Sequence, residues 1–546
     1  MNSSEPVREA GSHGPATSAE STSAWEPLRH PVFRGLWIAA LVSNTGTWMQ
    51  NVAAAWYMTS LSSSPLMVAL IQAATSLPVF LVGFPAGAVA DILDRRRLLL
   101  FTQAWMLAVA ALLAIWTFAG SMTSWTLIGF TFALGLGMAL NSPTWQAITP
   151  EVVPRRDLSA AVTLNSLTVN IGRAVGPALG GVLVAASGPA LVFGLNALSF
   201  VAVLYAVYRW RRTPAVSTLP PERVGGATRA GLRYIRHAGP IRAILVRTGL
   251  FMLAGCAFWA LLPVVARQEL GLDAFGYGAL LGCVGLGAIG GAMLLPRLKR
   301  RLRLDVVVVL ASLLYAGVTV LTGFCRWLPG LWLAMLVAGV AWIAILASLN
   351  AAAQTVVPPW VRARALGVYL VVFQGGLGAG SAAWGVIAEH LGTPQALALS
   401  AAGLVLGLAA VRRWPLDVAT TLDLTPSMHW PEPHVDIMPQ LDNGPVLVQV
   451  EYQIDQARAD AFIAAIRALA DVRRRDGAIE WDVFGDPSQP GRYVEIFMVE
   501  SWVEHLRQHE RVMMADQATQ DRVRQFHTPL DPPAVSHLVA ARRKNN

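Results

Sequence analysis

The sequence is short of charged residues and of cysteines, and both shortages exclude classes of protein. Charged side chains make up only 14% of the 546 residues, whereas soluble globular proteins carry about 25%. With 54% hydrophobic residues and a mean hydropathy of +0.49, the chain does not fit a disordered, collagen-like or ordinary soluble protein. The three cysteines lie in apolar runs without a CxxC pair, which predicts buried apolar side chains rather than a disulfide framework.

Several motifs that carry chemistry are also missing. The sequence has no P-loop GxxxxGK[ST], so ATP-driven transport is not supported, and neither GxSxG nor HExxH occurs. We therefore expect no enzymatic activity, no cofactor and no resident metal. Residues 1–30 contain no apolar stretch of the kind found in a cleaved signal peptide, and their composition predicts a disordered cytoplasmic tail.

What the sequence does contain is a series of long apolar runs. A helix needs about 20 apolar residues to cross the core of a lipid bilayer. Twelve stretches meet this requirement: 35–59, 65–90, 98–119, 124–147, 160–186, 190–209, 242–266, 275–296, 305–324, 330–353, 365–388 and 395–411. We therefore predict an all-α polytopic protein with twelve transmembrane helices.

The positive charge lies in one part of the chain and, within it, in alternate loops. Residues 1–413 carry 29 Lys and Arg against 13 Asp and Glu, whereas residues 414–546 carry 13 against 20. The loops on the side of the N-terminus hold 24 Lys and Arg, and the opposite loops hold only Arg267 and Arg326. Because cationic loops stay in the cytoplasm, this pattern predicts a multi-pass protein of the cell (inner) membrane with both termini cytoplasmic. It does not indicate a nucleic-acid partner.

The apolar part of the chain repeats itself at an offset of 204 residues. Val152-Val153-Pro154 aligns with Val356-Val357-Pro358, and Gly172, Gly176, Gly181 and Gly188 align with Gly376, Gly380, Gly385 and Gly392. A repeat after an even number of spans predicts two six-helix halves related by an axis along the membrane normal. The predicted organisation is a tail (1–30), an N-terminal six-helix bundle (31–209), a cytoplasmic linker (210–241), a C-terminal six-helix bundle (242–413), a linker (414–444) and a cytoplasmic domain (445–546).

Four segments resemble a known family. Residues 87–100 read GAVADILDRRRLLL, which resembles the signature between the second and third helices of the major facilitator superfamily. Residues 172–181, GRAVGPALGG, resemble a fifth-helix motif of exporters that work as antiporters, and residues 34–50 and 358–376 resemble the enterobactin-exporter-like branch.

The resemblance implies the major facilitator fold and secondary active transport by alternating access. The implied function is export of a small amphipathic molecule (a siderophore, drug or metabolite), with protons as the coupling ion. Two alternatives remain: an importer of the same fold, or a ligand sensor or enzyme that uses the C-terminal domain and is anchored by the helices.

Polar side chains within the spans are candidates for a substrate cavity. Arg173 lies about midway along the fifth predicted helix, where a charge is costly unless it faces the interior of the bundle. Arg173 could line a cavity that binds anionic groups, or it could be a packed structural arginine. Helix–helix hydrogen bonding is as plausible as substrate contact for the remaining polar candidates, and packing is the alternative for Trp48. These are Asn44, Trp48, Gln50, Asn51, Asn141, Gln146, Asn165, Asn170, Asn350, Gln354 and Gln374.

Two further groups of residues are candidates for gating. Small residues let helices approach closely, so Gly172, Gly176, Gly180 and Gly181, with a possible kink at Pro177, predict either tight packing or a seal near the outer side. At the cytoplasmic end of the second helix, Gly87, Asp91, Arg95 and Arg96 match the family signature. Asp91 is expected to lock an inner gate through a charge pair or a helix dipole, whereas topology alone could account for the arginines.

The C-terminal part predicts a soluble α+β domain. Strands at 446–452, 479–485, 492–500 and 534–539 and helices at 455–474 and 502–526 give the order βαββαβ of a ferredoxin-like fold. The stretch ESWVEHLRQHERV resembles antibiotic-biosynthesis-monooxygenase-like domains, which implies possible dimerisation. His505 and His509 have a metal-binding spacing but no evident third ligand, so we expect a solvated or dimer-facing surface there. Trp481 and Glu495 are expected in the core or an interface, although they could line a cleft.

Overall fold

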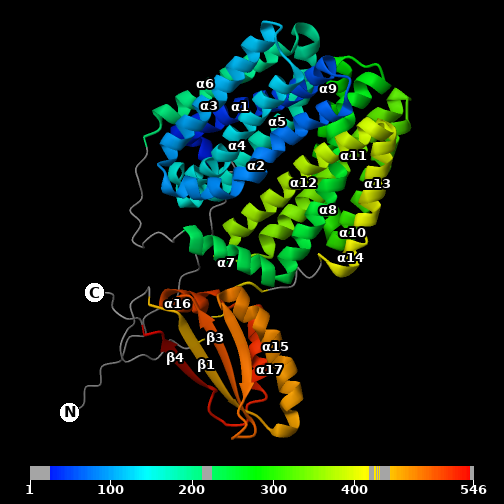
Figure 1. Ribbon diagram of the computed structural model, residues 1–546. Coiled ribbons are helices and arrows are strands. Elements are labelled where there is room, and N and C mark those ends of the chain that lie inside the picture. The colour runs from blue at the N-terminus through cyan, green and yellow to red at the C-terminus, as the bar shows by residue number, and fades with distance from the viewer. Residues whose placement is uncertain are drawn as a thin grey trace, which may run out of the picture.

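The computed structural model describes residues 25–211, 224–358, 360–416, 423–425, 427, 430 and 443–541. Most of the predicted tail and much of the predicted 414–444 linker lie outside these residues. Figure 1 shows a helical bundle of two lobes with a small α/β domain beneath it. We call the end of the bundle that faces this domain the near end, and the opposite end the far end.

The first lobe contains the first six long helices. Several of them begin at residues that cap a helix N-terminus: the side chains of Ser64, Asp94 and Thr123 accept backbone N–H groups of the first turn. The helices are α1 (Pro31–Leu61), α2 (Pro65–Ile92), α3 (Arg95–Phe118), α4 (Ser124–Val152), α5 (Leu158–Ser187) and α6 (Pro189–Arg209).

The second lobe repeats this order. Its helices are α8 (Gly239–Val264), α9 (Ala274–Arg301), α10 (Leu304–Phe324), α11 (Leu328–Thr355), α12 (Arg362–Leu391), α13 (Thr393–Gly407) and the short α14 (Ala410–Arg413). Among the described residues, 11 helices are long and apolar enough to cross a membrane. The 31-residue α1, which has a polar middle, is not one of them, so the count of twelve spans stays a prediction.

The repeat predicted from the sequence is visible in the packing. Shifted by 204 residues, the bounds of α5 coincide with those of α12. In the first lobe α1 packs on α5, α2 on α4 and α3 on α6; in the second lobe α8 packs on α12, α9 on α11 and α10 on α13. The lobes contact each other mainly through α2 with α12 and α5 with α9, which are again equivalent pairs. The two halves are therefore related by an approximate two-fold axis.

One helix was not expected. The sequence analysis assigned 210–241 to a linker, but the structure contains an amphipathic helix there, α7 (Val224–His237). Its residues Tyr234 and Ile235 are buried in the hydrophobic core of the second lobe. In Figure 1, α7 lies between that lobe and the α/β domain.

The α/β domain follows the predicted order of elements. Strands β1 (Val446–Gln453), β2 (Glu480–Gly485), β3 (Arg492–Val499) and β4 (Ala534–Val539) form an antiparallel sheet in the order β2-β3-β1-β4. Helix α15 (Ala459–Asp476) follows β1, and the predicted helix 502–526 is divided into α16 (Trp502–Arg511) and α17 (Met514–Arg524).

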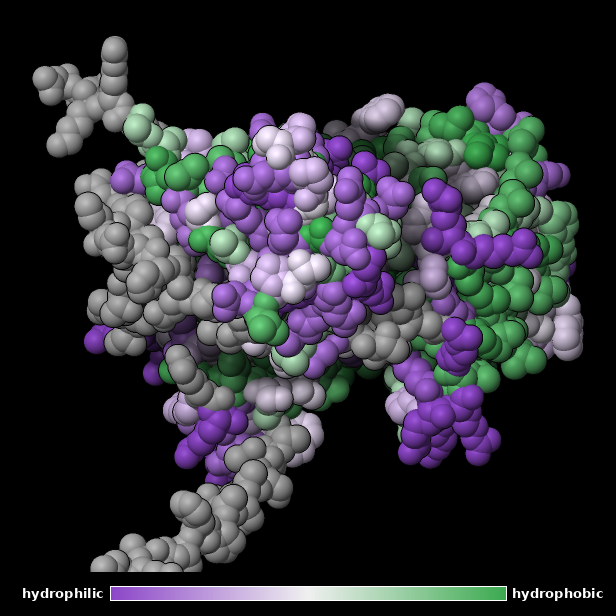
Figure 2. All heavy atoms as spheres, turned by 90° about the horizontal axis from the view of Figure 1, so that it is seen from below, coloured by the Kyte–Doolittle hydropathy of each residue, from purple (hydrophilic) through white to green (hydrophobic). Residues whose placement is uncertain are grey.

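The core of this domain lies between the sheet and its helices. Alternate residues of β1 are buried, and they pack against Phe462 and Ile466 of α15, Trp502 of α16 and Val523 of α17. Viewed from below, the described surface is hydrophilic over its centre, whereas hydrophobic residues gather along a flank of the molecule (Figure 2).

Candidate transport site

The most unusual side chain inside the bundle is Arg173, in the middle of α5. Its guanidinium carbon lies 5.3 Å from the ring centroid of Trp48 on α1, a distance typical of a cation–π contact. Its Nε is buried and has no hydrogen-bond partner within the described part of the chain. A half-buried cation next to an aromatic face can bind an anionic aromatic or carboxylate group, because the charge and the ring would both gain a partner.

Four of the predicted cavity residues join helices of the first lobe by hydrogen bonds. Asn44 Nδ2 donates to Thr168 Oγ1 (3.2 Å), and Asn165 Nδ2 donates to Thr149 Oγ1 (3.0 Å). Asn141 Oδ1 accepts from both Thr102 Oγ1 (3.2 Å) and Gln103 Nε2 (3.1 Å). Gln50 accepts from Asn196. Such bonds satisfy polar groups inside an apolar bundle, so helix–helix bonding is observed at these positions.

The other predicted cavity residues are more accessible. Gln146, Asn170, Asn350 and Gln354 are exposed, and Asn51 and Gln374 are half-buried. Asn170 Nδ2 donates to the Ser166 carbonyl (3.0 Å), and Gln354 Nε2 donates to Asn350 Oδ1 (2.7 Å). Asn170 also lines a groove with Thr163 and Ser166 of α5. Of the residues that join helices, Gln50 and Asn141 are buried, whereas Asn44 and Asn165 are half-buried.

The glycines of α5 face two different neighbours. A Cβ on Gly172, Gly176 or Gly180 would come within 3.0 Å of atoms between Asn44 and Met49 of α1, in the same lobe. A Cβ on Gly181 would lie 2.6 Å from the Cα of Gly278 on α9, in the other lobe. Pro177 is buried between these contacts. Three glycines thus pack the first lobe, and one brings the two lobes together.

The contact at Gly181 belongs to a larger junction at the far end. Gln268 Nε2 donates to the Ser63 carbonyl (2.9 Å), and Ser64 Oγ donates to Glu389 Oε2 (2.6 Å). Trp56 and Tyr277 stack with their ring centroids 5.6 Å apart. These polar and aromatic contacts join the lobes and close the far end between them.

At the near end, the predicted gating arginines bond within the first lobe. Arg95 donates to Glu151 Oε1 (2.7 Å) and to the Ala147 carbonyl (3.1 Å), which joins α3 to α4. Arg96 donates to the carbonyls of Val207 and Tyr208 at the end of α6. The side-chain surroundings of Gly87 and Asp91 lie outside what the structure describes, so their gating role stays a prediction.

The sequence analysis missed the contacts of two buried aspartates in the bundle. Arg247 of α8 pairs with Asp305 at the start of α10, and Asp305 Oδ2 also accepts the Leu416 backbone N–H (2.9 Å). His30 Nε2 lies 3.0 Å from Oδ2 of the fully buried Asp157. The only sequence signal for the first pair is that an arginine and an aspartate interrupt apolar runs, and nothing in the pattern indicates that they meet.

A second polar centre lies in the core of the α/β domain. Glu495 is fully buried and binds Arg473 through Nε (2.8 Å) and Nη2 (3.2 Å). It also accepts from Tyr452 (3.1 Å) and Trp481 (2.9 Å). Burial alone would raise the pKa of the Glu495 carboxyl, but Arg473 and the other donors outweigh burial and lower it. These contacts confirm that Glu495 belongs to the core.

The expectation for His505 was wrong. Its side chain is buried at 1% exposure rather than on a solvated surface, because Trp502 and His537 of β4 cover it. Burial lowers the pKa of His505 to about 3 and that of His509 to about 4. The described residues contain no group of three or more His, Cys, Asp or Glu arranged to hold a metal ion.

Comparisons with known proteins connect this architecture to transport. A family model described as "transmembrane secretion effector" matches residues 22–545. The staphyloferrin A transporter of Staphylococcus aureus is 25% identical over 276 residues, which cover 50% of this chain and 68% of that protein. The enterobactin exporter EntS of Salmonella typhi is 26% identical over 393 residues, which cover 69% of this chain and 90% of that protein.

A solved structure shares the fold. A bacterial homologue of the human lysosomal transporter Spinster, crystallised in an inward-facing and unoccupied conformation, superposes with a TM-score of 0.57. The match covers 72% of this chain and 98% of that one at 15% identity.

Proposed function

The chain belongs to the transmembrane secretion effector family of major facilitator transporters, and from this premise we propose that it exports a small amphipathic molecule by alternating access. Siderophores are the substrate class we favour, with drugs and other metabolites as alternatives. The observation that carries the proposal is Arg173 in the middle of α5, with its buried Nε unmatched and Trp48 beside it. A cation and an aromatic face together suit an amphipathic molecule that carries acidic groups.

The relatives' names support this substrate class. One relative is named an exporter of enterobactin and another a transporter of staphyloferrin A. We propose that the substrate binds between the two lobes, where Arg173 and the accessible polar residues Asn170, Asn350, Gln354 and Gln374 would contact it.

We further propose the topology that the charges predict. All twelve long helices span the membrane, including α1, whose polar middle then faces the protein interior. The near end, with its arginine-rich loops, the N-terminus and the α/β domain are placed in the cytoplasm. The far-end junction at Gly181 would then be an outer seal, closed while the near end is accessible.

Protons are our proposed coupling ion. The support is the resemblance of residues 172–181 to the fifth-helix motif of antiporters. Export would then be driven by protons returning to the cytoplasm.

For the α/β domain we propose a ferredoxin-like fold that is able to dimerise. The support is the strand order β2-β3-β1-β4 and a sheet face opposite the helices that carries half-buried Leu447, Ile496 and Met498.

A transport assay tests the proposed function. Inside-out membrane vesicles that contain the protein should accumulate at least one member of a panel of catecholate and hydroxycarboxylate siderophores. Vesicles with Arg173→Ala at the same protein level are the control and should accumulate none above background. Failure of the wild-type protein with the whole panel would exclude this substrate class.

A further inference from the structure

The α/β domain is docked onto α7 by a row of ion pairs. Arg229, Arg233 and His237 recur every four residues and therefore share one face of α7. Arg229 pairs with Glu500 (2.8 Å), Arg233 with Glu504 (3.3 Å) and His237 with Asp471 (3.3 Å). The three partners come from the residue after β3, from α16 and from α15, so three separate parts of the domain take part.

The buried face of α7 contacts the connection between α11 and α12. Tyr234 donates its hydroxyl to the Val356 carbonyl (3.4 Å), and its ring meets the ring of Trp360 edge-on at 5.6 Å. Arg511 of the α/β domain also lies over Trp360, with its guanidinium carbon 4.4 Å from the ring centroid. The domain thus touches the α11–α12 connection directly as well as through α7.

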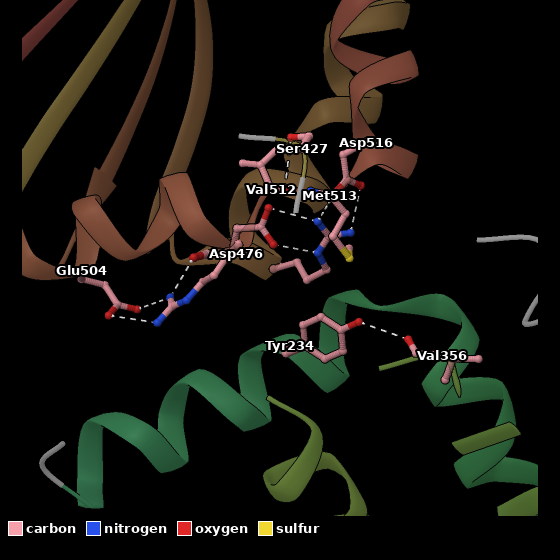
Figure 3. A network of polar contacts seen from close by, with 10 residues as sticks. Tyr234, Val356, Ser427, Asp476, Glu504, Val512, Met513 and Asp516 are labelled. Carbon is pink, nitrogen blue, oxygen red and sulfur yellow. Dashed lines mark hydrogen bonds and ion pairs between the residues drawn. The ribbon is translucent and has the colours of Figure 1, made fainter. Parts of the chain in front are cut away.

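The domain holds Arg511 rigidly for this contact. Glu504 accepts from Arg511 at 2.5 and 3.3 Å, and the Asp476 carbonyl accepts at 3.0 Å. Figure 3 shows this network above α7, with Glu504 and Asp476 on the domain side and Tyr234 and Val356 on the bundle side. Burial alone would raise the pKa of Glu504, but Arg511 and Arg233 outweigh it and keep the carboxylate charged. Glu504 therefore serves the domain and α7 together.

The proposed alternating access requires the contacted connection to move. The α11–α12 connection is the repeat mate of the α4–α5 connection, because Val356-Val357-Pro358 aligns with Val152-Val153-Pro154. Both connections lie at the near end, one in each lobe. In the present structure the lobes are joined at the far end, so the opposite state requires these two near ends to approach each other.

We propose that the α/β domain is an intramolecular clamp on the near end of the second lobe. It holds α7 and the α11–α12 connection in the far-end-closed conformation and so slows the step that brings the near ends together. This clamp rests on the proposed transport function, since its purpose is to limit a transport cycle. Releasing it should favour the near-end-closed state and speed transport.

A double charge reversal on α7 tests the clamp. Arg229→Glu with Arg233→Glu places like charges opposite Glu500 and Glu504. The matched control is Arg236→Glu, which changes an exposed arginine of the same helix that forms no ion pair with the α/β domain among the described residues. A second comparison isolates the exposed pair: Arg229→Glu alone should weaken docking, and the rescue variant, Arg229→Glu with Glu500→Arg, restores an attractive pair at this position.

Distances between spin labels report both docking and the conformational change in the full-length protein. Labels at Leu232 and Ser488 report docking, and labels at Arg156 and Arg300 report the gap between the near ends. We expect the double reversal to lengthen the Leu232–Ser488 distance. It should also raise the near-end-closed population about three- to fivefold, which is the size of effect expected from the loss of two partly exposed ion pairs. Arg236→Glu and the rescue variant should match the wild type.

The outcomes separate the clamp from the proposed function. Undocking without a rise in the near-end-closed population would overturn the clamp, as would a double reversal that leaves the domain docked. Because the label distances need no substrate, a protein that transports none of the panel would contradict the proposed function while the clamp is still decided.

Discussion

At the scale of single residues, two arginines in the helical bundle illustrate different uses of a buried charge. Arg247 has an acidic partner, Asp305, and joins α8 to α10. Arg173 has an aromatic neighbour and an unmatched Nε instead. A charge with a full set of partners stabilises the fold, whereas a charge with an unmatched donor can bind something else.

This difference predicts opposite phenotypes for the two alanine variants. Arg173→Ala should lose substrate binding at least tenfold and keep its melting temperature, because Leu377 occupies the equivalent position of the repeat. Arg247→Ala should lower stability by about 3 kcal/mol, because it removes the guanidinium that pairs with the buried Asp305 carboxylate. Binding titrations and thermal unfolding in detergent measure both, and a stable Arg247→Ala or a binding-competent Arg173→Ala would contradict this assignment.

The buried histidines predict a pH dependence for the α/β domain. His505 faces His509, His537 and Arg473, and burial lowers its pKa from 6.5 to about 3. A depressed pKa contributes stability above pH 6.5 that is lost as the pH falls toward 3, because the unfolded chain takes up the proton first. His505 alone should lower the free energy of unfolding of the domain by about 2–3 kcal/mol at pH 4.5 relative to neutral pH.

Limited proteolysis of the full-length protein in a urea series measures this loss. His505→Phe keeps an aromatic ring and removes the titrating group. The stability of this variant should therefore fall less than that of the wild type between pH 6.5 and 4.5. An identical pH profile for the variant would show that other groups set the dependence.

At the scale of elements, the periodic parts of the chain could be predicted and the non-periodic contacts could not. The helix 160–186 was expected and α5 extends from Leu158 to Ser187, because a bilayer-length apolar run has few alternatives. The helix α7 was missed because it has 14 residues, two glycines at its start and a strongly basic face. Its helical form depends on packing Tyr234 and Ile235 against the second lobe.

The same limit applies to the site. Sequence could indicate that Arg173 needs a partner, but Trp48 lies 125 positions away on another helix. Likewise, the glycines of α5 were recognisable as a close-packing set, yet the division between three contacts to α1 and one contact to α9 depends on the arrangement of helices.

That division predicts which glycine controls the far end. Gly181→Val should reduce transport at least tenfold, because its side chain would collide with the backbone of Gly278 and prevent the lobes from meeting. The matched control is Gly194→Val on α6, where an added Cβ meets nothing within 4 Å. Initial transport rates at equal protein level are the measurement, and equal rates for Gly181→Val and the wild type would exclude a role for this contact.

At the scale of the whole molecule, the orientation decides how every site is interpreted. The charge distribution predicts that the near end is cytoplasmic. A cysteine at Ser488, in the α/β domain, should react with an impermeant thiol reagent only after permeabilisation. A cysteine at Ser121, between α3 and α4 at the far end, should react in intact cells. The reverse labelling pattern would invert the topology and turn the proposed exporter into an importer.

The direction of transport tests the central proposal most directly. Inside-out vesicles that generate an acidic interior should accumulate a transported siderophore, and collapse of the proton gradient should abolish the accumulation. Right-side-out vesicles with an acidic exterior, which keeps the proton gradient in the same direction relative to the protein, should not accumulate it. Accumulation in the right-side-out vesicles, or accumulation that persists without the gradient, would contradict proton-coupled export.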